Sequence, residues 1–140
     1  MALEEIKKKF GGKWKLDRSE NFEDFLKEVG ANVVMRKLAA TSSPEMTISV
    51  EGDVIKIVIK SLVMTREENI KLGEEYESEM RGVKLSNVMV YEDGKLKIKS
   101  DPITSGYKAQ QLDRDVVDGE LVQVIKCGDV VCTRIFKKIE

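Results

Sequence analysis

Two arginines interrupt apolar stretches near the C-terminal end of the chain, and they are candidates for an anion-binding site. Arg134 lies in the middle of the run VVCTRIF at 130–136, and Arg114 alternates with Leu112 and Val116. A guanidinium group stays protonated and binds a carboxylate or a phosphate through parallel N–H groups. Because burying this charge without a counter-ion costs several kcal/mol, an anion must come from elsewhere in the fold or from a ligand.

The alternation of residues around Arg114 indicates that this side chain points inward. Gln111, Asp113 and Asp115 occupy the opposite face of the same strand and mark the outside. In the last strand, alternation alone leaves the face of Arg134 open. If both arginines point inward, no acidic residue of the three C-terminal strands shares their face.

The strands that position these residues are short alternating runs separated by tight-turn sequences. The expected strands cover 12–17, 45–51, 53–61, 66–71, 75–80, 83–91, 94–100, 106–117, 119–127 and 130–138. This pattern predicts a mainly β fold, a ten-stranded antiparallel up-and-down β-barrel, because closure removes exposed sheet edges. Ten strands enclose more space than side chains fill, so we expect an internal cavity.

A helix-turn-helix is expected between the first and second strands, where it would form a lid. Asn21 and Asn32 are candidate N-caps, and Gly30 ends the first helix. The apolar residues of the two helices are expected to line the lid or the cavity wall, or to be ordinary core: Phe22, Phe25, Leu26, Val34, Met35 and Leu38.

The length, charge balance and lack of histidine argue against several classes of function. The 140 residues fit a single domain over 1–140, and 24 basic against 25 acidic residues give no general attraction to nucleic acid. Histidine is absent, which removes the commonest general base and zinc ligand, so we expect no metal, no cofactor and no enzyme. Mixed-charge strings such as the segment 65–68 indicate solvated surface.

The sequence favours a cytoplasmic protein with reduced thiols. No apolar stretch approaches the roughly 20 residues that span a bilayer, and the N-terminus lacks the apolar segment of a secretory signal. A hairpin turn at Gly128-Asp129 would place Cys127 near Val130 and Cys132 near Ile125, so a disulfide between them is not expected.

Three segments resemble the cytosolic fatty-acid-binding protein family, the intracellular lipid-binding proteins. They are GKWKL at 12–16 followed by NFEDFL at 21–26, KLGEEY at 71–76, and VVCTRIF at 130–136. The resemblance extends in order over about residues 10 to 139. The matched region contains no large gap. The resemblance implies a calycin-like ten-stranded barrel with a helical lid that encloses a long-chain fatty acid or another hydrophobic acid.

The resemblance also implies where the ligand carboxylate is held. In the family, an Arg in the third strand from the end and an Arg-x-Tyr in the last strand bind it, and these positions match Arg114, Arg134 and Phe136. Phe136 departs from the family because a phenyl ring cannot donate a hydrogen bond. Gln123 is a second departure, and its amide is a candidate donor in place of the missing tyrosine. The predicted cavity wall and portal also include Val63, Leu112 and Ile125.

Other functions remain as alternatives. A retinoic-acid-type carrier fits the two arginines, whereas retinol carriers have Gln at both positions. A membrane-surface lipid-interaction protein would use basic residues of the N-terminus and the helices, including Lys7 to Lys9 and Arg36, for transient membrane contact. A secreted lipocalin or a lipid isomerase fits less well. We expect a monomer.

Overall fold

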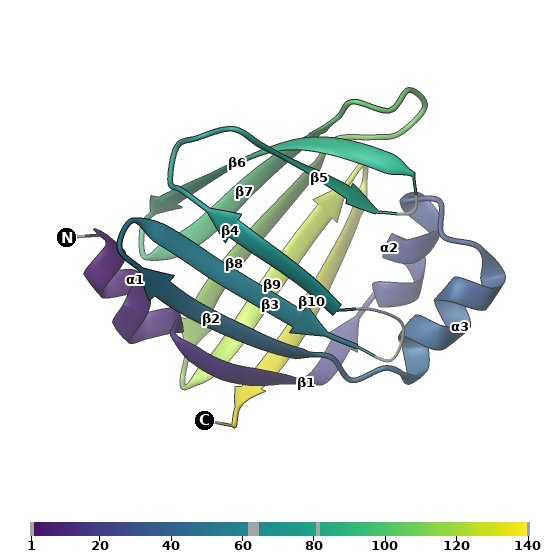
Figure 1. Ribbon diagram of the computed structural model, residues 1–140. Coiled ribbons are helices and arrows are strands. Elements are labelled where there is room, and N and C mark those ends of the chain that lie inside the picture. The colour runs from purple at the N-terminus through teal and green to yellow at the C-terminus, as the bar shows by residue number, and fades with distance from the viewer. Residues whose placement is uncertain (1, 62–64, 81, 140) are drawn as a thin grey trace.

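The computed structural model describes residues 2–61, 65–80 and 82–139, and these fold into a nearly closed barrel (Figure 1). The strands are β1 (Gly12–Glu20), β2 (Glu45–Glu51), β3 (Val54–Lys60), β4 (Thr65–Ile70), β5 (Tyr76–Met80), β6 (Val83–Glu92), β7 (Lys95–Pro102), β8 (Gln110–Val117), β9 (Glu120–Cys127) and β10 (Val130–Lys138). The predicted ten-stranded antiparallel meander is therefore confirmed.

The order of the strands shows where the barrel stays open. The sheet runs β4-β3-β2-β1-β10-β9-β8-β7-β6-β5, with β1 paired to β10. Among the described residues no ladder joins β4 to β5, so the prediction of a fully closed barrel is wrong at this one junction. The interior is therefore bordered by two edge strands that carry their own inward-facing side chains.

Tight turns set the register of the C-terminal strands. Asp93 and Gly94 have φ of 53° and 75°, and Asp118 and Gly119 have φ of 52° and 80°. Two consecutive residues with positive φ are typical of the type I′ turn, whose twist matches that of the flanking strands. The Asp93–Gly94 turn joins β6 to β7 and the Asp118–Gly119 turn joins β8 to β9, so these turns fix which residues of each strand pair lie opposite one another.

The lid consists of α2 (Phe22–Glu28) and α3 (Val33–Thr41), as the sequence predicts. Asn32 caps α3 by accepting a hydrogen bond from the Met35 backbone N–H at 2.9 Å. Asn21 makes no such cap and adopts a left-handed conformation with φ of 59°. Its side-chain amide instead donates to the Val131 carbonyl oxygen at 3.3 Å, which ties the start of the lid to β10.

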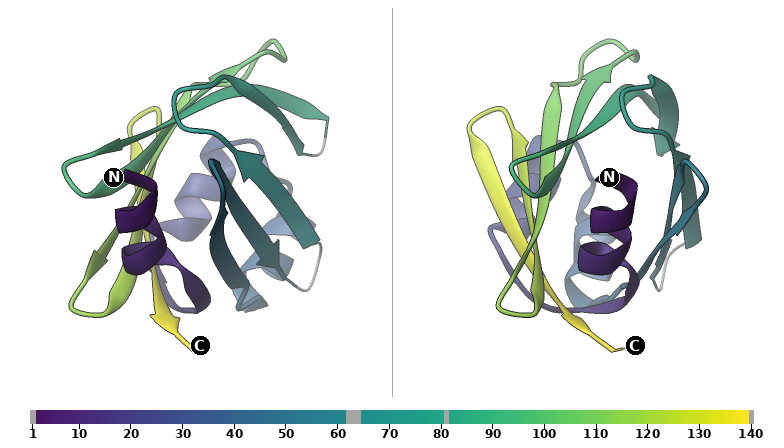
Figure 2. Two further views of the ribbon diagram at one scale, coloured as in Figure 1. Left: turned by 60° about the vertical axis from the view of Figure 1, so that its left-hand side comes forward. Right: turned by 90° about the vertical axis from the view of Figure 1, so that its left-hand side faces the viewer.

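A helix that the sequence analysis did not predict, α1 (Ala2–Phe10), lies across the barrel end opposite to the lid (Figure 2). Ile6 and Phe10 are fully buried in the barrel core. The Phe10 carbonyl accepts a hydrogen bond from the Trp14 indole N–H at 2.8 Å, and Lys9 forms an ion pair with Asp115 at 2.7 Å. In the described part of the chain no helix has the length and apolar character needed to cross a membrane.

The two cysteines are free and buried, with exposed fractions of 1% for Cys127 and 0% for Cys132. The register pairs Cys127 with Val130 and Cys132 with Ile125, which confirms the expectation that no disulfide joins them. Burial raises the pKa of both thiols.

We therefore predict slow thiol modification in the native protein. At pH 8 a colorimetric disulfide reagent should react at least about 100-fold more slowly with folded than with denaturant-unfolded protein, because neither thiol is accessible or readily ionised. The measurement is the rate of thiolate release by absorbance. Rapid reaction of both thiols in the native protein would contradict the burial seen here.

Candidate ligand-binding site

Arg114, Gln123 and Arg134 form a continuous row on the inner face of three neighbouring strands. Gln123 in β9 lies opposite Arg114 in β8 and also opposite Arg134 in β10. The residues two positions along β9, Leu121 and Ile125, are buried, so this face is the interior one. The structure thus brings together the two predicted arginines and the predicted amide.

Arg114 is buried with one of its donors unsatisfied. Its exposed fraction is 3%, and its Nε donates to Gln123 Oε1 at 3.0 Å. Among the described residues Nη1 has no hydrogen-bond partner. Burial lowers the pKa of Arg114, and the nearby Glu68 carboxylate acts in the opposite direction. A buried N–H without a partner is costly, and an anionic ligand would satisfy it.

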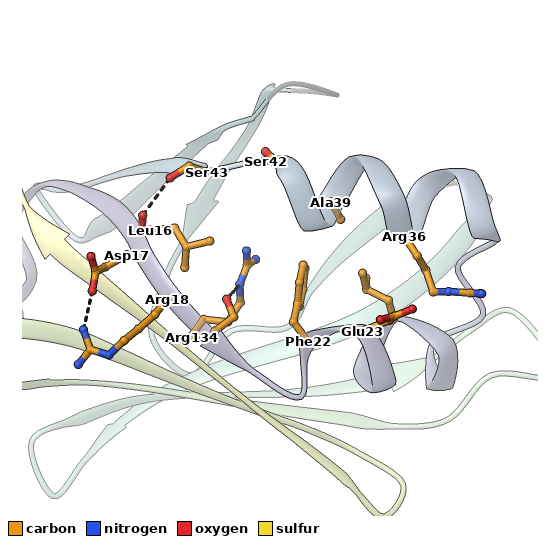
Figure 3. Close-up of a pocket in the computed structure, with 12 residues that line it drawn as sticks. Leu16, Asp17, Arg18, Phe22, Glu23, Arg36, Ala39, Ser42, Ser43 and Arg134 are labelled. Atoms are coloured by element: carbon orange, nitrogen blue, oxygen red, sulfur yellow. Dashed lines mark hydrogen bonds and ion pairs between the residues drawn. The ribbon is translucent and has the colours of Figure 1, made fainter.

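Arg134 faces the lid from the other end of the row (Figure 3). Its Nε donates to Ser19 Oγ at 3.1 Å, and its guanidinium carbon lies 3.8 Å from the centre of the Phe22 ring. This stacking is a cation–π contact. Burial lowers the pKa of Arg134 to about 10, so the group is charged at neutral pH. Nη2 is buried and has no partner among the described residues.

A cavity of about 510 Å³ lies between β1, β10 and the two lid helices (Figure 3). Its lining consists of Leu16, Asp17, Arg18, Ser19, Phe22, Glu23, Leu26, Arg36, Ala39, Ser42, Ser43 and Arg134. Arg36, which the sequence analysis assigned only to an outer basic surface, thus lines this cavity, and its Nη1 donates to the Ala31 carbonyl at 2.8 Å. Arg134 is the link between this cavity and the inner row.

Most of the predicted cavity and portal residues lie on the lid's inner side. Phe25, Leu26 and Ile125 are buried together with both cysteines, and Phe22 and Met35 pack against that group. Leu112 packs against this group and against the main barrel core.

Two of the predicted lining residues lie elsewhere. Val34 is 66% exposed and Leu38 is 39% exposed, so they belong to the outer surface of α3 rather than to the cavity wall. A helix presents only one face to the barrel, and Met35 and Ala39 occupy it. Val63 falls outside the described residues.

Phe136 contributes packing at the position where the family pattern has tyrosine. It lies two residues along β10 from Arg134, on the same face, and its exposed fraction is 3%. It packs in the main core with Trp14 and Leu121. Its ring gives the polar row an apolar boundary and no hydrogen-bond donor.

The prediction that Arg66 and Glu68 lie on solvated surface is wrong. In β4 the exposed positions are Thr65, Glu67 and Asn69, whereas Arg66 and Glu68 share the face of the fully buried Ile70. Arg66 Nη2 lies 3.4 Å from Glu68 Oε1. The sequence feature that could have placed Arg66 and Glu68 inside is their alternation with Ile70, the one apolar residue of this strand.

The interior therefore contains one carboxylate that the sequence analysis missed. Glu68 is paired with Arg66, and it also acts electrostatically on Arg114. Because Glu68 is paired with Arg66, it does not form an ion pair with Arg114, and among the described residues the guanidiniums of Arg114 and Arg134 donate to the neutral side chains of Gln123 and Ser19. The positive potential that an anionic ligand requires is thus reduced by Glu68 but still present.

Comparisons with known proteins show which family model and which relatives this chain matches. Residues 11–139 match the model of the lipocalin / cytosolic fatty-acid binding protein family, so α1 precedes the matched segment. Cellular retinoic acid-binding protein 2 of Mus musculus is 37% identical over 132 residues, covering 91% of this chain and 96% of that protein. Sodium/calcium exchanger regulatory protein 1 of Doryteuthis pealeii is 33% identical over 129 residues, covering 92% and 96%.

A solved structure shows the same architecture. The apo form of Caenorhabditis elegans lipid binding protein 8 superposes with a TM-score of 0.90 at 30% sequence identity, over 94% of this chain and 96% of that one.

Proposed function

Since the chain belongs to the lipocalin / cytosolic fatty-acid binding protein family, we propose that it is an intracellular carrier of a long-chain hydrophobic acid. Arg114 and Arg134 hold the carboxylate. The observation that supports this assignment is that each guanidinium faces the interior with one buried N–H group lacking a partner among the described residues. The fold and family are those of lipid-binding carriers, and we assign no enzymatic step to the site.

The acyl chain supplies most of the affinity. Burying about 16 carbons at about 0.8 kcal/mol per methylene gives a gross gain on the order of 12 kcal/mol before immobilisation costs. The arginines contribute orientation and select acids over alcohols, because a carboxylate offers a guanidinium an opposite charge and two acceptor oxygens, whereas an alcohol offers one neutral oxygen.

Gln123 takes part of the role of the missing tyrosine. Its Oε1 accepts from Arg114 Nε, so the amide NH₂ is the part of the side chain that can donate to a ligand. Phe136 closes the apolar side of the row. The ligand head thus meets two guanidiniums and an amide rather than a guanidinium pair and a phenol.

The ligand reaches the interior when the lid moves. α2 and α3 cover the cavity that contains Arg134, and Lys108 forms an ion pair with Glu28 at the end of α2. Val33 and Val34 are exposed on α3, which supports a transient contact with membranes during exchange. We propose that the carrier acts as a monomer with one lipid-binding domain.

A fatty acid and a retinoid acid are the two ligand classes to separate. Relatives named for each class match this chain, at 37% identity for a retinoic acid-binding protein and 35% for Fatty acid-binding protein 12 of Rattus norvegicus. Both classes present one carboxylate to the same arginines. We favour a fatty acid, because a flexible chain adapts to an inner wall that carries the polar side chains of Arg66 and Glu68.

Native mass spectrometry of the purified protein, with extraction and identification of the bound lipid, tests this function. We expect one acid per chain, released on denaturation and identified as a long-chain fatty acid. A retinoid acid would keep the site assignment and change the ligand class. Failure to take up any hydrophobic acid, even after delipidation and incubation with an excess, would contradict the proposed function.

A further inference from the structure

Arg66 and Glu68 occupy positions on the barrel wall. If the ligand were a plain alkyl chain, apolar side chains would suit these positions better. The two residues lie opposite Ile59 and Ile57 of β3, on the inner face that also contains Ile55 and Ile70. Three of these isoleucines are almost fully buried, with exposed fractions of 0 to 1%. An ion pair in such a wall is less favourable than apolar side chains unless its remaining hydrogen-bonding groups find partners.

The contact between Arg66 and Glu68 leaves hydrogen-bonding groups of both side chains free for a ligand. It joins Nη2 of Arg66 to Oε1 of Glu68 at 3.4 Å. A carboxylate accepts at both oxygens and a guanidinium donates from five N–H groups, so most of this capacity is still open to a ligand. The interior asparagine of β6, Asn87, is different: it bonds to Ser78, Ser100 and the Tyr76 carbonyl, and is satisfied by the protein itself.

The ion pair also acts electrostatically on Arg114, the first residue of the inner row. Burial lowers the pKa of Arg114, while Glu68 opposes this shift and Arg66 adds to it. Burial raises the pKa of Tyr76 on the facing edge strand β5, and Glu68 adds to this shift. Residues of β4, β5 and β8 thus share one electrostatic neighbourhood, to which Arg114 also presents its unpartnered Nη1.

We propose that Arg66 and Glu68 form a second polar subsite, and that the preferred ligand is a long-chain acid carrying a hydroxyl group on its chain. This inference rests on the proposed function and specifies its ligand class. A hydroxyl group donates to Glu68 and accepts from Arg66 at the same time, which neither an alkyl chain nor a second carboxylate can do. Because the pair acts on Arg114, the hydroxyl belongs in the carboxyl half of the chain.

The test compares hexadecanoic acid with a series of hydroxyhexadecanoic acids by displacement of a fluorescent fatty-acid probe. In the wild-type protein we expect one isomer hydroxylated in the carboxyl half to bind about 10-fold more tightly than hexadecanoic acid. In the double variant Arg66→Leu/Glu68→Leu, hexadecanoic acid should bind more tightly and the preference should fall to about twofold or less.

The matched control is Lys56→Leu/Glu67→Leu, which removes an ion pair from the outer face of β3 and β4 and should retain the preference. Glu68→Gln keeps the side-chain shape and should lose part of it. Tight hexadecanoic acid binding with no hydroxyl preference in the wild type, or a preference retained in Arg66→Leu/Glu68→Leu, would overturn the subsite and leave the carrier function intact. Failure of every acid to bind would overturn the carrier function and this inference together.

Discussion

Replacing Arg114 and Arg134 together by glutamine is expected to weaken binding of a long-chain acid at least about 100-fold, because each charge-assisted hydrogen bond contributes roughly 1.5 to 3 kcal/mol. The same variant should bind the corresponding alcohol with less than about threefold change, since the apolar contribution is retained. Displacement titrations with a matched acid and alcohol of equal chain length provide the measurement.

The control for this prediction is Arg18→Gln. Arg18 in β1 contributes to the cavity lining but not to the inner row, and its guanidinium bonds to Asp17 and Glu120 on the exposed side. Arg18→Gln removes one positive charge, as each of the two substitutions in the inner row does, but it leaves the inner row intact. The affinity for the acid should therefore be retained. Equal losses for acid and alcohol in the Arg114→Gln/Arg134→Gln variant would show that the arginines support the fold rather than the carboxylate.

Phe10→Ala is expected to lower the free energy of unfolding by about 3 to 5 kcal/mol, the cost of deleting a fully buried aromatic side chain. Phe10 is 0% exposed and packs beside Trp14 where α1 meets β1. The backbone carbonyl that accepts the indole hydrogen bond survives the substitution, so the loss measures packing alone. Urea unfolding followed by tryptophan fluorescence gives the value.

Val33→Ala provides the comparison for Phe10→Ala. Val33 is an apolar residue of α3 with 54% exposure, so shortening it should change stability by no more than about 0.5 kcal/mol. If Phe10→Ala cost no more than Val33→Ala, α1 would not be anchored in the core as seen here.

The strand pattern was predictable because its signals are local. Hairpin turns such as Asp93-Gly94 and Asp118-Gly119 force positive φ and leave few registers to the strands around them. Once the Asp118–Gly119 turn joins β8 to β9 and the Gly128–Asp129 turn joins β9 to β10, register and alternation place Arg114, Gln123 and Arg134 in a row. The inward direction of Arg114 follows from neighbours two positions away.

The N-terminal helix was missed because its signal is weak in isolation. Leu3, Ile6 and Phe10 lie at i, i+3 and i+7 among charged residues, which is an amphipathic pattern over only nine residues. Helices this short are marginal in water, and their stability comes from the surface against which they pack. The open end of the barrel supplies that surface to α1.

By itself, the sequence determined the antiparallel meander, the lid after the first strand and the inward direction of Arg114, because alternation and turn chemistry act over a few residues. The inward direction of Arg134 followed from the family resemblance, and its register opposite Gln123 shows it in the structure. Only the tertiary structure decided what those guanidiniums face. Glu68 and Arg114 are 46 positions apart in the chain, and β4 and β8 are not neighbours in the sheet, so the effect of the Glu68 carboxylate on the pKa of Arg114 depends on how the sheet curves. Electrostatic contact across a barrel is a property of how the sheet closes, and that information is not contained in any single strand.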